Sequence, residues 1–420
     1  MKLSTSTAAL FVLAAGLSAD VLVVAPTLGP GIDHTSIFTA VKAASEGDTI
    51  LVHDGTYDRF VIDGKSLDVI ALGDGAYLKS TTQLTTSNAP AMPTAWIINL
   101  AADQSVLVQG FTSNIGVRVD FCEGPVWFDQ HVVEGFPSLA ACMSQPNAGG
   151  EVGHSANVTF TNCRLVGERG NQIWYVVDPG AGVYARFSTV QLYGCSIVGG
   201  GGNPFTYMTA VTGAAGLKIK ESDVLVSGCS IEGGPGGTTT GATCGSTPAA
   251  GGPGVEFETT GGTLHAAATT AVGGFLDLTA LCPGMTGPVG PAIEGSGTVV
   301  SLPGYYRELV ANNPVRGGET LTFDVAGQPG ETPIVLLSSD HAPVLLTNYA
   351  GALLVGHPLA DLFVLPSLQA SGRESLSMVV PNVGLPVGAV SFYAQACFFD
   401  PLGQVWLGSG TTVTLLDGSF

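Results

Sequence analysis

Basic residues are scarce in this sequence of 420 residues, which contains 14 lysines and arginines against 33 aspartates and glutamates. The formal charge of -19 argues against nucleic acid as a partner, because phosphates would be repelled without a strong local basic patch. Charged residues make up only 11% of the chain, yet no apolar run is long enough to cross a bilayer. We therefore expect no membrane span.

The 59 glycines follow no three-residue period, which excludes a collagen-like triple helix. Together with 25 prolines they are too frequent for a helical protein. Frequent glycine and proline favour many short strands joined by turns. A chain of this length can form two domains, each with its own core.

The first residues match the pattern of an export signal. Lys2 supplies a positive charge, residues 8–17 form a short apolar stretch, and Ser18 and Ala19 offer a small-residue cleavage site. A short buried helix is the alternative. We expect residues 1–19 to be a signal peptide, the mature chain to begin at Asp20, and the protein to be extracellular or at the cell surface.

Three segments in the middle of the sequence read almost alike: 158–167, 190–199 and 224–233. Looser copies occupy 126–135 and 264–273. Apolar residues alternate within each copy, as in a strand, and the alternation breaks at an asparagine or a glycine. These residues enter the left-handed backbone region at little cost, so each copy is predicted to be two short strands meeting at a sharp bend.

A third strand precedes each pair, at 116–120, 182–186, 216–220 and 254–258. Three strands in a repeat of just over thirty residues correspond to one turn of a parallel β-helix. Leucine-rich and propeller repeats fit less well, because the first needs its leucine consensus and the second needs four antiparallel strands per blade. The predicted class is therefore all-β.

A helix predicted over residues 36–44 precedes the first strands and would cap the end of this solenoid. The segment from Phe38 to Tyr57, with Gly47-Asp48-Thr49-Ile50 at its centre, resembles the N-terminal signature of the pectin-lyase-like superfamily. The resemblance implies a right-handed parallel β-helix, and it carries little information on activity because this fold hosts lyases, hydrolases, epimerases and adhesins.

We expect three regions: the signal peptide at 1–19, the β-helix at 20–300, and a C-terminal module at 301–420. Six strand-like segments separated by turns predict an antiparallel β-sandwich of immunoglobulin-like size for this module. It vaguely resembles C-terminal modules of exported bacterial proteins. Residues 233–253, rich in glycine, threonine and proline, are predicted to form a mobile loop.

Eight cysteines in an exported chain suggest disulfides, and the predicted pairs are Cys122–Cys142 and Cys244–Cys282. The repeat predicts otherwise for Cys163, Cys195 and Cys229. These three would stack about 4.8 Å apart with parallel side chains, which suits a buried thiol ladder better than a bridge or a metal site. Cys397 is predicted to be buried.

The first strand of each repeat carries large polar residues on its outward face. A row of cations there could hold an acidic polysaccharide, with Tyr184 stacking on a sugar ring, whereas a solvated face neutralised by salt bridges such as Lys220 to Glu258 is the alternative. The predicted substrate-binding residues are Arg118, Asp120, Tyr184, Lys218, Glu256 and Glu258. Arg186, Lys220 and His154, aligned at one level, are the candidate catalytic bases.

Catalysis on this face would be lyase chemistry, in which a base removes the proton beside a uronate carboxylate and cations or Ca²⁺ stabilise the charge. Residues 126–131 resemble the Val-Trp-Ile-Asp-His stretch of pectate lyases, but Gln130 interrupts it and His131 falls in the inward cysteine column. The polygalacturonase motifs are absent. We expect a carbohydrate-binding protein, and the alternatives are a polysaccharide lyase acting on a uronate-containing glycan and a structural or adhesive rod.

Overall fold

The computed structural model describes residues 20–79, 92–135, 147–170, 178–202, 210–238, 248–258, 261–276, 286–381 and 388–418. The predicted signal peptide lies outside these ranges, and so do Cys142, Cys244 and Cys282. The chain divides into two compact units. The parallel unit contains Leu22–Ala43 and Ile50–Leu302, and the C-terminal unit contains Pro303–Phe420 with two short N-terminal segments.

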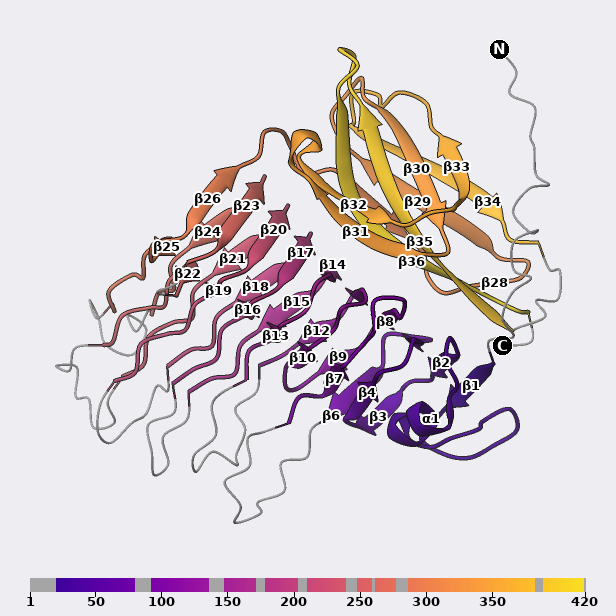
Figure 1. Ribbon diagram of the computed structural model, residues 1–420, viewed down its shortest axis with the longest axis horizontal. Coiled ribbons are helices and arrows are strands. Elements are labelled where there is room, and N and C mark those ends of the chain that lie inside the picture. Colours follow the sequence, from indigo (N-terminus) through magenta and orange to yellow (C-terminus); the bar gives the residue numbers. More distant parts are fainter. Residues whose placement is uncertain are drawn as a thin grey trace. The chain divides into compact units, whose positions relative to one another are not determined.

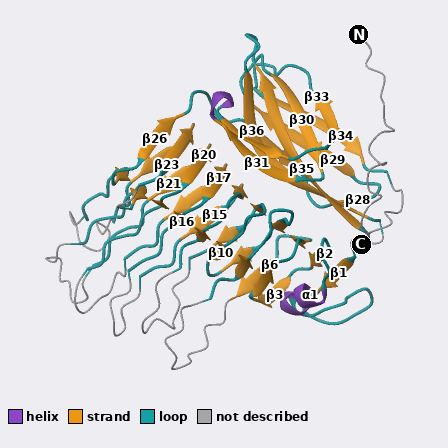
Figure 2. Ribbon diagram, in the orientation of Figure 1, coloured by secondary structure: helices purple, strands orange, loops and turns teal. Residues whose placement is uncertain are grey.

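Three long parallel sheets form the parallel unit, and each coil of the chain passes through them in the order I, II, III (Figures 1 and 2). Sheet I has eight strands: β4 (Phe60–Asp63), β7 (Ala95–Ile98), β10 (Val117–Asp120), β13 (Gly150–Gly153), β16 (Val183–Arg186), β19 (Leu217–Lys220), β22 (Val255–Phe257) and β25 (Ile293–Glu294). Sheet II has ten: β1 (Val21–Val24), β2 (Thr49–Val52), β5 (Leu67–Ala71), β8 (Val106–Gln109), β11 (Val126–Asp129), β14 (Val158–Thr161), β17 (Thr189–Tyr193), β20 (Asp223–Ser227), β23 (Thr263–Ala267) and β26 (Thr298–Ser301). Sheet III has eight: β3 (Gly55–Asp58), β6 (Ala76–Lys79), β9 (Thr112–Ser113), β12 (Val132–Val133), β15 (Arg164–Val166), β18 (Ser196–Val198), β21 (Ser230–Glu232) and β24 (Thr270–Val272).

The predicted repeats lie directly over one another. Val158 pairs with Val190, and Val190 pairs with Val224, so the three similar segments occupy the same position in successive coils. The predicted bends at Asn162, Gly194 and Gly228 have φ angles of 54°, 61° and 63°. The all-β class with parallel β-helix stacking is therefore confirmed.

The predicted thiol ladder, formed by Cys163, Cys195 and Cys229, fills an inward column at the bend between sheets II and III. Each Sγ donates a hydrogen bond to the carbonyl oxygen two residues earlier, at 3.3 to 3.5 Å. The Cys195 amide also donates to Cys229 Sγ at 3.4 Å. All three cysteines are free thiols, and burial raises the pKa of Cys195 and Cys229 well above the usual value. Cys397 is buried and free, as expected.

Cys122 corrects one predicted disulfide. It is a buried free thiol rather than half of a bridge to Cys142. Its side chain points into the coil, where Sγ donates to the carbonyl oxygen of Asp120 at 3.3 Å and the amide donates to Ser155 Oγ at 3.2 Å. Burial raises the pKa of this thiol to about 11. Because its side chain belongs to an inward column, its place resembles that of the thiol ladder.

A layer of extended glycine-rich segments connects sheet III to sheet I in successive coils (Figure 1). Backbone hydrogen bonds of 2.7 to 2.9 Å run across this layer from Gly252 through Gly234, Ala214 and Gly200 to Gly180. A Cβ atom on Gly200, Gly234 or Gly252 would lie 2.0 Å from a backbone oxygen of a neighbouring segment, so only glycine permits this approach. The described residues of 233–253, for which a mobile loop is predicted, belong to this hydrogen-bonded layer.

The C-terminal unit consists of smaller, mainly antiparallel sheets around one core, as predicted. This core includes Leu309, Phe323, Val335 and Phe398, and the short segment Val315–Arg316 pairs in parallel with Leu415 and Leu416. The three-stranded sheet contains β27 (Glu308–Ala311), β29 (Thr320–Ala326) and β34 (Arg373–Val379). The five-stranded sheet contains β28 (Val315–Arg316), β36 (Val405–Leu416), β35 (Ala389–Phe399), β30 (Thr332–Ser338) and β33 (Leu359–Val364). A hairpin of β31 (His341–Leu346) and β32 (Gly351–Val355) encloses the 3-10 helix η1 (Thr347–Tyr349).

The short helix α1 (Ile37–Ala43) lies close to the predicted position and contacts β3 and β4 of the first coil. Ile37, Ala40 and Val41 are its buried residues. Its role as a cap stays a prediction. Within the described residues, no helix has the length and apolar character needed to traverse a membrane.

Candidate functional site

The outer face of sheet I carries the predicted polar ladder in two rows. The first row runs in register through Arg118, Glu151, Tyr184, Lys218 and Glu256. The second row runs through Asp120, Gly153, Arg186 and Lys220, and Glu258 follows β22 beside Lys220. The structure therefore brings every predicted ladder residue except His154 onto one face.

Asp120 is the centre of the first half of this ladder, and its side chain is only 1% exposed. It accepts hydrogen bonds from Arg118, from Arg186 Nη2 at 3.2 Å and from Trp96 Nε1 at 3.3 Å. Glu151 bridges the same two arginines, at 3.6 Å from Arg118 and 3.3 Å from Arg186. Burial of a carboxylate requires such compensation, which the two guanidinium groups supply.

The predicted alignment of His154 with Arg186 and Lys220 is wrong by one residue. Gly153, not His154, pairs with Arg186 and with Asp120. The space left by this glycine is what lets Arg186 reach Asp120 across an intervening strand, because a Cβ at position 153 would lie 2.6 Å from Asp120 Oδ1. A slip of one residue moves a side chain to the other face of a strand, and here it moves His154 to the bend that follows.

The second half of the ladder is neutralised in the same way. Lys218 contacts Glu256 and Glu258 at 3.1 Å each, and Lys220 contacts Glu258 at 3.0 Å. Tyr184 donates its hydroxyl to Glu258 at 3.2 Å, and Lys218 lies 5.7 Å from the centre of the Tyr184 ring. The hydrogen bond to Glu258 raises the pKa of Lys220, so this amine holds its proton more firmly and is a poorer base.

All four cations of the ladder are thus engaged by carboxylates of the same face. The arginines Arg118 and Arg186 and the lysines Lys218 and Lys220 face the four acids Asp120, Glu151, Glu256 and Glu258. The described residues contain no group of three or more histidine, cysteine or acidic side chains that could hold a metal ion. The face therefore presents balanced charge rather than a free row of cations.

Three aromatic rings form a second feature at the bend between sheets I and II. Phe121, His154 and Phe187 occupy the same place in successive coils, with φ angles of 53°, 50° and 51°. His154 is stacked between the phenylalanines, with ring centres 5.1 and 4.8 Å apart and interplanar angles of 3° and 14°. We call these three residues the aromatic column.

The aromatic column is both strained and exposed. A bulky side chain in the left-handed region costs about 1–2 kcal/mol, and this conformation also recurs at other bends, such as those at Asn99, Asn162 and Glu221. Phe121 is 56% exposed and Phe187 is 41% exposed, although nearby apolar side chains of the unit are almost all buried. Neither local conformation nor core packing explains why aromatic residues occupy these positions.

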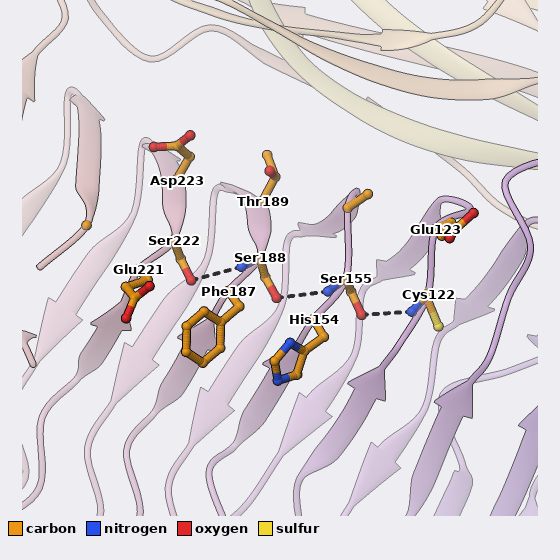
Figure 3. Close-up of a pocket in the computed structure, with 12 residues that line it drawn as sticks. Cys122, Glu123, His154, Ser155, Phe187, Ser188, Thr189, Glu221, Ser222 and Asp223 are labelled. Carbon is orange, nitrogen blue, oxygen red and sulfur yellow. Dashed lines mark hydrogen bonds between the residues drawn. The ribbon is translucent and has the colours of Figure 1, made fainter. Parts of the chain in front are cut away.

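A row of inward side chains follows the aromatic column and fixes the bend. The serine row comprises Cys122, Ser155, Ser188 and Ser222 (Figure 3). The amides of the first three donate to the Oγ of the next member at 3.1 to 3.2 Å. Each serine hydroxyl also donates to the carbonyl oxygen two residues earlier, at 2.8 to 2.9 Å. These bonds lock four successive coils in register beneath the rings.

A groove of about 560 Å³ lies over the serine row. Figure 3 shows His154, Phe187 and Glu221 along one side of the row. Glu123, Thr189 and Asp223 lie along the other side. The lining residues come from five successive coils, separated by four steps of about 4.8 Å, so the groove extends over about 19 Å. It suits an elongated ligand.

The acidic residues of this groove form no close ion pair. Glu123, Glu221 and Asp223 are exposed, and none of them forms an ion pair with a described residue. No lysine or arginine is found among the described residues that line the groove. The free charge on this part of the surface is therefore negative.

His131 lies in the inward column of the thiol ladder, as its alignment predicted. It is fully buried beside Ser113, whose Oγ lies 3.2 Å from its Nε2. Burial lowers its pKa to about 3, so it stays neutral in the core. The resemblance of residues 126–131 to pectate lyases therefore does not place a histidine on the surface.

The chain matches no model of a known protein family and no curated protein sequence.

The aromatic column and the groove were missed by sequence reasoning, although a signal for them exists. The strands of sheet I are followed by the dipeptides Phe121-Cys122, His154-Ser155, Phe187-Ser188 and Glu221-Ser222. A large residue followed by a small polar residue, at the repeat distance, marks this bend. The double glycine Gly149-Gly150 obscured it, because aligning the second glycine with Gly182 shifts His154 into the ladder.

Proposed function

We propose that this protein binds carbohydrate along the groove beside the aromatic column, and that it acts at or outside the cell surface. The aromatic column carries the proposal, because exposed apolar side chains gathered at one place on a soluble surface mark binding sites. Aromatic rings next to a few polar groups are the usual composition of a ligand site. Sugar rings offer apolar C–H faces and hydroxyl groups that match both.

Other features support this proposal. The groove crosses five coils and suits an oligosaccharide better than a compact metabolite. The export signal predicted at residues 1–19 would deliver the protein to extracellular glycans.

The lyase interpretation gains no such support. Its candidate bases Arg186 and Lys220 are held by Asp120, Glu151 and Glu258, and His154 is stacked between two rings away from them. Incubation with uronate polymers and Ca²⁺ is expected to yield no unsaturated, ultraviolet-absorbing product.

A glycan array probed with the full chain tests the proposal. Wild-type protein should bind at least one class of glycan, and the double variant Phe121→Ala/Phe187→Ala should bind it about tenfold more weakly, which corresponds to about 1.4 kcal/mol. Phe275→Ala is the matched control, because Phe275 is 46% exposed and belongs to neither the aromatic column nor the groove. Absence of binding to every glycan, or equal binding by the double variant, would refute the proposal.

A further inference from the structure

We infer that the groove takes a glycan bearing protonated amino groups, such as a polymer of glucosamine, rather than a neutral or uronate-containing one. This inference rests on the proposed carbohydrate binding and adds the charge of the ligand to it. It depends on which charged side chains of the parallel unit are held in ion pairs and which are not.

The cations next to the groove are not available to an anionic ligand. Arg186 and Lys220 directly precede the bend residues Phe187 and Glu221, so they lie closest to the groove in sequence. Arg186 is held by Asp120 and Glu151, and Lys220 by Glu258. Recruiting either cation to a uronate would remove an existing ion pair of the ladder, and Arg186 would leave Asp120, which is almost fully buried, with Arg118 as its remaining cation.

The carboxylates of the groove, in contrast, are available. Glu123 stands at one end and Glu221 and Asp223 at the other, on opposite sides of the serine row (Figure 3). All three are exposed and form no ion pair within the described part of the chain. A uronate polymer would be repelled by these carboxylates, whereas a polyamine-bearing glycan could pair with them.

The aromatic column favours the same class of ligand. The faces of aromatic rings attract cations, and ammonium groups are recognised by aromatic side chains in this way. Phe187 stands next to Glu221 along the bend, so a ring and a carboxylate meet at one end of the groove. A sugar carrying an ammonium group can use both contacts at once, and a neutral sugar can use only the ring.

Affinity measurements on the full chain with three oligosaccharides of equal length test the inference. These are β-1,4-linked glucosamine, its N-acetylated counterpart, and galacturonate, all under mildly acidic conditions that keep the amines protonated. The glucosamine oligomer should bind about tenfold more tightly than the N-acetylated oligomer, and the difference should shrink at high salt because exposed charges are screened. Galacturonate should not bind, with or without Ca²⁺.

Isosteric variants assign the effect to the groove. Glu221→Gln and Asp223→Asn should each weaken binding of the glucosamine oligomer by about twofold to fivefold, the usual effect of one exposed ion pair, without changing that of the N-acetylated oligomer. Asp103→Asn removes an exposed carboxylate outside the groove and should leave both affinities unchanged. Circular dichroism and thermal unfolding of each variant verify the fold.

The outcomes separate the two proposals. Equal or tighter binding of the N-acetylated oligomer, or binding of galacturonate in either condition, overturns the preference for amino sugars and leaves carbohydrate binding intact. Equal weakening by Asp103→Asn overturns the assignment to the groove. Failure to bind any of the three oligomers, together with a blank glycan array, overturns both proposals.

Discussion

A single buried histidine contributes a pH dependence to the stability of the parallel unit. His131 occupies a column whose next three members are cysteines, and its burial lowers its pKa to about 3. An unfolded histidine has a pKa of about 6.5. Between these values the unfolded chain takes up a proton that the folded chain excludes, so the free energy of unfolding falls as the pH falls.

His131→Cys places the side chain type of the next coils in this column and removes the titrating group. From about pH 6 to about pH 4 the free energy of unfolding should decrease less steeply in the variant than in the wild type, by about 1.4 kcal/mol per pH unit. Urea unfolding across this range measures both slopes. Identical slopes would contradict the burial of a neutral imidazole at this position.

Glycine is required at position 153 because neighbouring side chains occupy the space of a Cβ atom, and not because of its backbone conformation. A Cβ at this position would lie 2.6 Å from Asp120 Oδ1 and 2.9 Å from Arg186 Nε. Gly153→Ala should therefore displace the ion pair over Asp120 and lower the free energy of unfolding by about 1–3 kcal/mol. Gly29→Ala is the control, since a Cβ there meets no atom within 4 Å. Equal stability of the two variants would show that Asp120 and Arg186 do not meet over Gly153.

At the scale of elements, both short bends of the central coils share one hydrogen-bonding arrangement. A residue in the left-handed region is followed by an inward serine, cysteine or threonine, whose side chain donates to the carbonyl oxygen two residues earlier. The serine row does this between sheets I and II, and the thiol ladder does it between sheets II and III. Cysteine and serine therefore form the same type of hydrogen bond at these positions, as Cys122 in the serine row shows.

This equivalence predicts losses of stability of different size for two substitutions of one residue. Ser188→Ala removes a donor to the Arg186 carbonyl at 2.8 Å and the acceptor of the Ser155 amide at 3.1 Å, and should lower the free energy of unfolding by about 1–3 kcal/mol. Ser188→Cys keeps both functions and should lose less than half as much. Thermal and urea unfolding of the two variants compare them, and an equal loss would mean that these hydrogen bonds do not stabilise the bend.

The sequence alone predicted the coils where the repeat is regular, as in the segments around Cys163, Cys195 and Cys229. Alternation and bend residues determine those strands, because one face of each must be buried. It did not predict the layer of glycine-rich segments that connects sheets III and I, because that layer depends on backbone contacts between segments far apart in the sequence. It also missed the groove, because one ambiguous glycine displaced His154 by one position. Pairing within the ladder was foreseen only for Lys220 and Glu258.

For the molecule as a whole, the positions of the charged side chains indicate more about a binding partner than the net charge does. The formal charge of -19 and the outward cations together suggested a basic strip on an acidic protein. The ladder is instead internally paired, and the free charge of this region belongs to the carboxylates of the groove. The account of function therefore depends on one surface, where strained aromatic rings and unpaired acids lie side by side.

Chemical footprinting of His154 tests most directly whether a ligand binds at this surface. Carbethoxylation of exposed histidines, read by mass spectrometry, should slow severalfold at His154 when the strongest-binding glycan is present. His53, which is also exposed and is not a residue of the groove, should react at an unchanged rate. Equal rates at His154 with and without bound glycan would contradict the placement of the ligand beside the aromatic column.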